Sequence, residues 1–377
     1  MSISILAYIH PIRTYLPCTG VGRHTNAVIH QLSQQAAITV NLLVSKQCLG
    51  LHSNLDSRSP LKDLPILTFP IPENLAERSW KLAGLPRMDC FIPDGTNWLY
   101  APMETYIPVS KCPVAVTIHD IQAFETNLPW SHTWQHRLFR LKWQQWIYRT
   151  LKHCRVVFTV SEFSKQRMVE LLGADPHKLV VIGNGIEPSF FEIATINPAT
   201  LPLPVADPYV LMIGGLRQKK GGDAYLTLAQ HLQRQHSNLQ IVIAGTSDPA
   251  YIQAAQDFPN IHLLGLVPDA DLPRFLRGSL ALLFLSPYEG FGIPALEAMA
   301  AGVPAIVANR AALPEVVGDA GIVVEPDATA EIVDILVTLN NNTALRHDYI
   351  QRGQHHAAQY TWDRCVDRLI TAFNEFA

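Results

Sequence analysis

Short, continuous apolar runs alternate with longer amphipathic segments along almost the whole of this 377-residue chain, and this pattern strongly limits the folds open to it. Runs that are apolar at consecutive positions are typical of parallel strands buried on both faces. The segments between them, such as residues 23–36 and 161–172, have the apolar spacing of helices. The runs in the first half are residues 3–9, 113–119, 155–161 and 178–183. The alternation predicts right-handed strand–helix–strand units around a parallel sheet.

A proline-rich segment, ATINPATLPLPVADP, interrupts this pattern at residues 194–208. Its four prolines lack the backbone donor that a helix or a strand ladder requires. We therefore expect an N-terminal domain of residues 1–193, a linker of 194–208 and a second domain of 209–360. Strands are expected in the second domain at residues 209–215, 239–245, 261–267, 280–286, 304–309 and 321–326. Two doubly wound α/β domains of ordinary size are predicted to face each other across a ligand cleft.

Charge and cysteine content limit the class of protein. A formal net charge of -3 gives no general reason to expect nucleic acid as a partner. The six cysteines include no C-x-x-C pair, which predicts neither a disulfide framework nor a zinc site and fits a reducing cytoplasm. The N-terminal MSISILAYIH has no basic n-region, so we interpret it as a strand. Since no run reaches the roughly 18 to 20 apolar residues of a membrane span, we expect a cytoplasmic protein that can touch a membrane without crossing it.

Two carboxylates flank a glycine-rich turn in the segment SPYEGFGIPALEAMAAG, residues 286–302. The turn follows an apolar strand, so Glu289 and the backbone N–H groups of Phe291 and Gly292 are expected at the carboxyl edge of the sheet. Glu297 would lie about one turn into the following helix. Backbone amides and the helix dipole favour a phosphate, and carboxylates accept bonds from sugar hydroxyls. The alternative is that Glu297 is only an early-helix acid favoured by the dipole.

Residues 286–326, with EGFG, LEAMAAG, LPEV and GDAG, resemble the donor-site segment of the family-four retaining glycosyltransferases. This resemblance implies the two-domain GT-B fold and a nucleotide-activated sugar as donor. It implies that Glu289 contacts the donor sugar, that Glu297 binds the nucleotide ribose, and that Gly290 belongs to the same turn. It also implies that a last helix at 361–377 packs back on the first domain.

Two segments of the N-terminal half are similar to the same family. In CTGVGRHTNAVIHQL, Gly20 and Gly22 resemble the glycine-rich loop that lets the backbone approach substrate. In TIHDIQAFE, the T-x-H-D pattern places His119 at the end of an apolar strand, where it could face the cleft. A lone histidine is often structural, and that reading remains open for His119.

The loop LRQKKGGDAYL follows the first strand of the second domain. Lys219 and Lys220 precede two glycines and a helix, so they could stabilise a departing diphosphate. The alternative is a solvated basic loop. Gly215 occupies the place where the family commonly has an arginine, and Arg217 or Lys219 could replace that arginine.

The D-x-D pattern of Asp269 and Asp271 is the metal signature of a different glycosyltransferase fold. Here it precedes an amphipathic helix, where either aspartate reads as an N-cap. We therefore predict no metal and no cofactor.

Residues 130–155 contain six Lys or Arg, four tryptophans and no acidic residue. A basic helix with aromatic residues could lie on an anionic membrane surface, near a lipid-linked acceptor. Alternatively, the tryptophans pack inside the N-terminal domain.

These observations predict a retaining glycosyltransferase that moves a hexose from a nucleoside diphosphate sugar to a glycan or lipid-linked acceptor in polysaccharide assembly. Mannose from GDP-mannose is the first choice for the donor. The alternative is a non-catalytic nucleotide-sugar-binding or partner-subunit protein on the same fold. The catalytic residues that we expect are His119, Glu289, Lys219 and Lys220. The donor-binding residues that we expect are Gly20, Gly22, Gly215, Arg217, Gly290, Phe291, Gly292 and Glu297.

Overall fold

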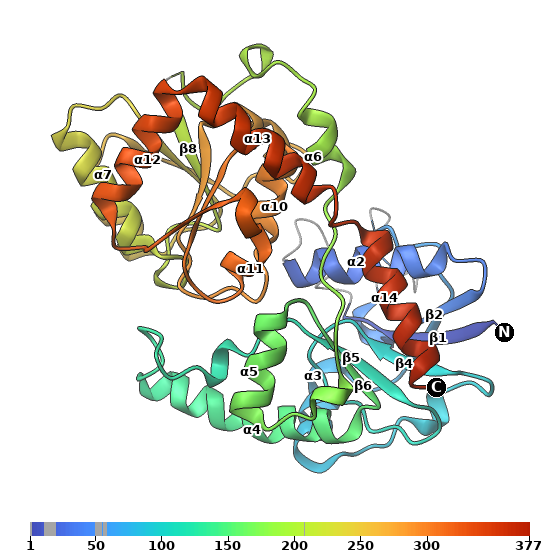
Figure 1. Ribbon diagram of the computed structural model, residues 1–377. Helices are drawn as coiled ribbons and strands as arrows, with labels where there is room; N and C mark the ends of the chain where they lie inside the picture. The colour runs from blue at the N-terminus through green and yellow to red at the C-terminus, as the bar shows by residue number, and fades with distance from the viewer. Residues whose placement is uncertain (1, 11–19, 50–54, 56–58, 207) are drawn as a thin grey trace. The chain divides into compact units, whose positions relative to one another are not determined.

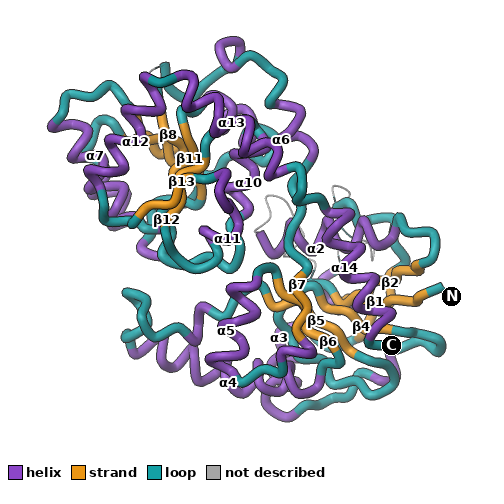
Figure 2. The backbone as a smooth tube through the Cα atoms, viewed as in Figure 1, coloured by secondary structure: helices purple, strands orange, loops and turns teal. Residues whose placement is uncertain are grey.

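A computed structural model of the chain describes residues 2–10, 20–49, 55, 59–206 and 208–377. The chain divides into two compact units (Figure 1). The first consists of Met1–Gly185 together with Trp362–Ala377, and the second of Ile186–Thr361. Each unit has one parallel sheet with helices on its faces (Figure 2), so the predicted pair of doubly wound α/β domains is confirmed.

The sheet of the first unit has seven strands in the order β3-β2-β1-β4-β5-β6-β7, and every pairing is parallel. The strands are β1 (Ile3–Tyr8), β2 (Ile38–Ser45), β3 (Ile66–Phe69), β4 (Trp98–Ala101), β5 (Val114–Ile118), β6 (Val156–Thr159) and β7 (Leu179–Val181). The four apolar runs of this half form β1, β5, β6 and β7. The sequence analysis did not predict β2, β3 and β4, and Asn41 interrupts the apolar run of β2.

Helices cover both faces of this sheet. Helices α2 (Gly20–Ser33) and α14 (Trp362–Glu375) pack on one face, in a core with Phe158 and Ile182. Helices α3 (Glu73–Ala83), α4 (Trp134–His153) and α5 (Glu162–Leu172) pack on the other. The expected cap of α5 is confirmed, since the Ser161 hydroxyl accepts a hydrogen bond from the Ser164 N–H at 3.0 Å.

The sheet of the second unit has six parallel strands in the order β10-β9-β8-β11-β12-β13. The strands are β8 (Tyr209–Ile213), β9 (Gln240–Ala244), β10 (Ile261–Gly265), β11 (Ala281–Phe284), β12 (Ala305–Ala308) and β13 (Ile322–Val324). All six lie in the apolar runs of this half. The helices are α6 (Pro188–Ile193), α7 (Gly222–Arg234), α8 (Pro249–Ala255), α9 (Leu272–Gly278), α10 (Ile293–Ala300), α11 (Leu313–Val317), α12 (Thr329–Asn341) and α13 (Thr343–Ala357).

The first unit ends at Gly185, eight residues before the boundary expected from the prolines. Helix α6 packs against α9 and α10, which places it in the second unit. The segment 194–208, expected as a linker, belongs to the same unit, and Arg277 Nε donates a hydrogen bond to the Ile196 carbonyl at 3.0 Å. The prolines of this segment interrupt regular secondary structure, but the segment still packs as part of the second unit.

Helix α14 returns the chain to the first unit. Its Phe373 carbonyl accepts a hydrogen bond from Trp98 Nε1 at 3.2 Å, and its apolar face packs against α2. This is the packing that the family resemblance implied for the last helix, and its strongly amphipathic spacing supplies the apolar face that packs.

Candidate functional site

The second unit has a topological switch point between β8 and β11. From β8 the chain builds outward through β9 and β10, and from β11 it builds the other way through β12 and β13. The loops that follow β8 and β11 therefore diverge at the carboxyl edge of the sheet. Ligands of open α/β sheets bind in the crevice that such diverging loops leave.

Two of the predicted residues meet at this switch point. Lys220 ends the short 3₁₀ helix η6 (Gln218–Lys220) after β8, and Glu289 lies in the turn after β11. The Lys220 ammonium lies 2.6 Å from Glu289 Oε1. Both side chains retain some exposure, 31% for Lys220 and 18% for Glu289, so a ligand can reach either group.

The loop after β8 also explains the glycine that stands in place of the family's arginine. Gly215 has a φ of +74°, and a Cβ built on it would lie 2.1 Å from the Thr246 carbonyl oxygen. No side chain fits there without moving the backbone. Arg217 instead donates from Nε to that same carbonyl at 2.7 Å and lies 3.8 Å from Asp248. Lys219 is exposed at the surface of the loop.

The turn after β11 leads into α10. Gly292 caps this helix with a φ of +120°, and a Cβ there would lie 2.7 Å from a methyl group of Leu313. Gly290 is buried, and the Phe291 ring packs inward, with its centre 6.0 Å from that of Tyr360. Glu297 lies one turn into α10 and is only 2% exposed. The structure thus places a buried carboxylate in the second turn of α10.

The first unit holds the histidine predicted from T-x-H-D. His119 follows β5, and its backbone N–H donates to the Glu104 carboxylate at 2.8 Å. Its ring Nε2 lies 3.1 Å from the Pro102 carbonyl oxygen. Because a carbonyl only accepts, this contact places a proton on Nε2 and fixes the ring orientation.

Sequence reasoning missed His24, which packs edge-on against His119 with ring centres 4.6 Å apart. It is fully buried, and its Nδ1 bonds to the Asn184 amide oxygen at 2.8 Å. Burial, and then the neighbouring His119, lower the pKa of His24 well below its usual value. The sequence signal that could have identified His24 as buried is its place in α2, where it lies on the apolar face four residues before Val28.

The predicted glycine-rich loop lies only partly within the described residues. Residues 11–19 fall outside them, while Gly20 and Gly22 form the first turn of α2. These two glycines are therefore helical rather than part of a loop. If Gly20 carried a Cβ atom, no atom of the described residues would lie within 4 Å of it.

Of the D-x-D aspartates, Asp271 occupies the N-cap position of α9, where its side chain makes no capping hydrogen bond to the helix and pairs instead with Arg274 at 3.3 Å. Asp269 lies in the turn before it. Within the part of the chain that the structure describes, no group of His, Cys, Asp or Glu side chains could hold a metal ion. The five described cysteines are free thiols.

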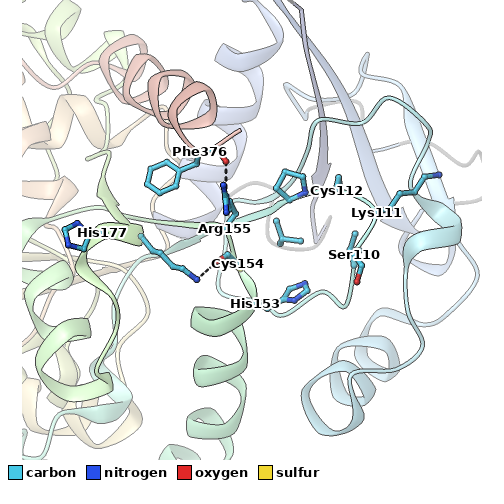
Figure 3. Close-up of a pocket in the computed structure, with 12 residues that line it drawn as sticks. Ser110, Lys111, Cys112, His153, Cys154, Arg155, His177 and Phe376 are labelled. Carbon is cyan, nitrogen blue, oxygen red and sulfur yellow. Dashed lines mark hydrogen bonds between the residues drawn. The ribbon is translucent and has the colours of Figure 1, made fainter.

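A cavity of about 670 Å³ in the first unit has none of the predicted site residues in its lining, which Figure 3 shows. It opens at the amino ends of β5, β6 and β7, whereas His119 follows the carboxyl end of β5. Arg155 and Lys178 line it but are engaged by the carbonyls of Phe376 and Cys154. Since ligands of such sheets bind at the carboxyl edge, this cavity is separate from the candidate site.

Two family descriptions match this chain in succession. "Glycosyltransferase Family 4" matches residues 19–190, and "Glycosyl transferases group 1" matches residues 194–356. The chain belongs to the family-four glycosyltransferases. This glycosyltransferase is 26% identical to the O-antigen chain mannosyltransferase B of Escherichia coli over 376 residues, 95% of this chain and 96% of its relative. It is 28% identical to a phosphatidyl-myo-inositol mannosyltransferase of Mycobacterium leprae over 58% of each chain.

Solved structures agree on the fold of this glycosyltransferase. A glycosyltransferase from Rickettsia africae superposes with a TM-score of 0.70 at 18% identity, covering 100% of this chain and 98% of that one. The Anabaena protein HepE in complex with UDP and glucose gives a TM-score of 0.70 at 17% identity, covering 99% of each. These likenesses confirm the predicted GT-B fold. The two family matches and the mannosyltransferase relative support the predicted glycosyltransferase enzyme.

Proposed function

We propose that this glycosyltransferase moves a hexose from a nucleoside diphosphate sugar to a hydroxyl of a lipid-linked glycan, with retention at the anomeric carbon. GDP-mannose is the donor that we propose first. The observation that carries the proposal is the Lys220–Glu289 pair at the switch point, which offers a cation and a carboxylate on adjoining loops. The near-full-length similarity to an O-antigen chain mannosyltransferase supports the choice of mannose and of a polysaccharide acceptor.

Departure of the diphosphate leaves negative charge on phosphate and positive charge on the sugar. In our proposal, Lys219 and Lys220 stabilise the leaving diphosphate, together with the N-terminus of α10. Glu289 accepts hydrogen bonds from the sugar hydroxyls and remains close to the positive charge that develops. Glu297 anchors the ribose.

His119 contacts the sugar or the reacting centre when the substrates are bound. Its proton on Nε2 is held by the Pro102 carbonyl, so the ring offers Nδ1 as an acceptor. Attack by the acceptor hydroxyl on the face that the diphosphate leaves gives retention. We propose this same-face attack because none of the carboxylates in the motifs is an obvious covalent nucleophile.

A thermal-shift panel of UDP-, GDP-, ADP- and dTDP-sugars tests the donor site in the wild type and in Glu297→Ala. One nucleotide should stabilise the wild type. Losing a charge-assisted ribose contact of about 1.5 to 3 kcal/mol should weaken its binding roughly ten- to a hundredfold in the variant. Glu331→Ala is the matched control, because it removes an exposed carboxylate from α12 of the same unit. If no nucleotide sugar binds, the proposal fails.

Retention has its own test. The enzyme is incubated with the donor and an acceptor glycan, and the anomeric configuration of the new linkage is read by NMR. An α-linked donor should give an α-linked product. A β-linked product would overturn the retaining mechanism while leaving the donor site in place.

A further inference from the structure

Helix α4 packs on the first unit through one of its faces. His136, Trp146, Ile147 and Thr150 are buried on that face. The Lys81 ammonium lies 4.1 Å from the Trp146 ring centre, and Ile147 belongs to the core beneath the helix. The expectation that tryptophans of residues 130–155 pack inside the domain is therefore right for Trp146, and Trp130 is also buried.

The opposite face of α4 carries large apolar side chains into solvent. Trp134 is 69% exposed, Leu138 48%, Leu141 61% and Tyr148 41%. Their spacing of four, three and seven residues puts them on one stripe of the helix. Exposed Gln145 lies between Leu141 and Tyr148 on this face, so the continuous part of the stripe is Trp134, Leu138 and Leu141. Single exposed apolar residues are common on proteins, but three on successive turns of one helix face mark an interaction surface. We call this stripe the lipid-facing stripe.

Basic side chains accompany the stripe without any acid. Arg137 and Lys142 lie on its two flanks by helical spacing, Lys152 continues it towards the C-terminal end, and all three are exposed. Helix α4 contains no Asp or Glu. Among the residues that the structure describes, no carboxylate forms an ion pair with Arg137, Lys142 or Lys152. The helix therefore presents uncompensated positive charge beside exposed apolar surface.

The neighbouring helix α3 also carries exposed apolar side chains. Leu75 is 57% exposed and Leu82 is 72% exposed, seven residues apart on one side of α3. Helices α3 and α4 pack together on the same side of the sheet (Figure 2), where Arg149 of α4 donates to the Trp80 carbonyl of α3 at 3.4 Å.

We propose that the lipid-facing stripe of α4 lies in the surface of an anionic phospholipid bilayer, with the helix parallel to the membrane plane. This inference rests on the proposed function, which places the acceptor on a lipid. Apolar side chains would enter the boundary between headgroups and acyl chains, while Arg137, Lys142 and Lys152 extend to the lipid phosphates. Among the described residues, no helix is long and apolar enough to cross a membrane, so this contact is peripheral.

The basic side chains beside the lipid-facing stripe favour a lipid surface over a protein as the partner of this face. The core of a protein interface is depleted in charged residues, and Lys in particular is rare there. This face instead combines Trp and Leu with unpaired Lys and Arg, which complements a layer of phosphate groups.

Flotation of the full chain with vesicles tests the proposal. The wild type should bind vesicles that contain phosphatidylglycerol and phosphatidylcholine in equal parts, with binding that weakens as salt is raised, and should not bind phosphatidylcholine alone. The triple variant Arg137→Gln, Lys142→Gln, Lys152→Gln should lose about a hundredfold in affinity. The variant Trp134→Ser, Leu138→Ser, Leu141→Ser should no longer bind even at low salt. The variant Ile252→Ser, Leu266→Ser, Val337→Ser is the matched control, since it removes exposed apolar side chains from the second unit and should bind as the wild type does.

Three results would overturn the proposal: no wild-type binding to anionic vesicles, equal binding by the stripe variants, or a wild-type dimer that the serine variant dissociates. The last would show that a second copy covers the stripe. Each variant is first shown to keep the wild-type melting temperature and its transfer to a water-soluble acceptor glycan. If vesicles bind but no nucleotide sugar does, the proposed function fails while the membrane contact stands.

Discussion

Lys220 and Glu289 form an ion pair of 2.6 Å although 69 residues separate them in the chain. They meet because β8 and β11 are parallel neighbours in the sheet, so the loops after these two strands begin side by side at its carboxyl edge. Each side chain stabilises the other in the free enzyme. In the proposed function, an arriving diphosphate would compete with Glu289 for the Lys220 ammonium, and sugar hydroxyls would compete with Lys220 for the carboxylate. The pair thus keeps both groups oriented before substrate binds.

A double-mutant cycle on this pair should show strong coupling. We expect Lys220→Ala and Glu289→Gln each to lower kcat/KM for the donor about a hundredfold, because each removes charge aimed at the transition state. The fold loss in kcat/KM of the double variant should be smaller than the product of the two single-variant losses, since the second change no longer breaks an ion pair. The cycle Asp348→Asn, Arg352→Ala on α13 is the control, an exposed pair at 2.7 Å that should affect kcat/KM little. Independent, multiplying losses at Lys220 and Glu289 would contradict the coupling.

The sequence predicts separate roles for Lys220 and Glu289, since each follows an apolar strand in a segment with family motifs. Their contact could not be predicted, because strand order in a sheet is a long-range property that no local pattern records. The same limit applies to His24, whose partners come from the loop after β5 and the loop after β7. Length does not separate the strands that were predicted from those that were missed, since β6 and β7, of four and three residues, were predicted and β3 and β4, of four residues each, were not.

Replacing Gly215 should destabilise the second unit through a backbone clash. Gly215→Ala places a Cβ 2.1 Å from the Thr246 carbonyl oxygen at a φ of +74°. Gly265→Ala is a close control, because Gly265 has a φ of +69° in the same unit with nothing within 4 Å of its Cβ. The control should lose only about 1 to 2 kcal/mol of unfolding free energy for the positive φ, and Gly215→Ala should lose more. Equal melting temperatures for the two variants would show that the loop relaxes without cost.

Chelation should leave activity unchanged. The proposed site neutralises the leaving diphosphate with lysines and helix N–H groups, and Asp271 of the D-x-D pattern pairs with Arg274 at 3.3 Å. We expect transfer rates in excess EDTA to equal those in added Mg²⁺ or Mn²⁺, and Asp269→Asn to act like the wild type. A rate that falls in EDTA and returns with one metal ion would contradict this prediction, whatever the behaviour of Asp269→Asn.

The burial of His24 should make the first unit acid-sensitive. Burial lowers the pKa of His24 well below its ordinary 6.5, so below that pH the unfolded chain binds a proton that the folded chain does not. The stabilisation is complete above pH 6.5 and falls by about 1.4 kcal/mol per pH unit as the pH drops towards the folded pKa. His24→Asn keeps a donor for Asn184 and removes the titration. Urea unfolding followed by tryptophan fluorescence should therefore show a shallower pH slope in this variant, by about 1.4 kcal/mol per unit, than in the wild type. The control is His177→Asn, which changes an exposed histidine and should keep the wild-type slope of unfolding free energy against pH. If His24→Asn also keeps the wild-type slope, His24 is protonated in the folded protein and the prediction is wrong.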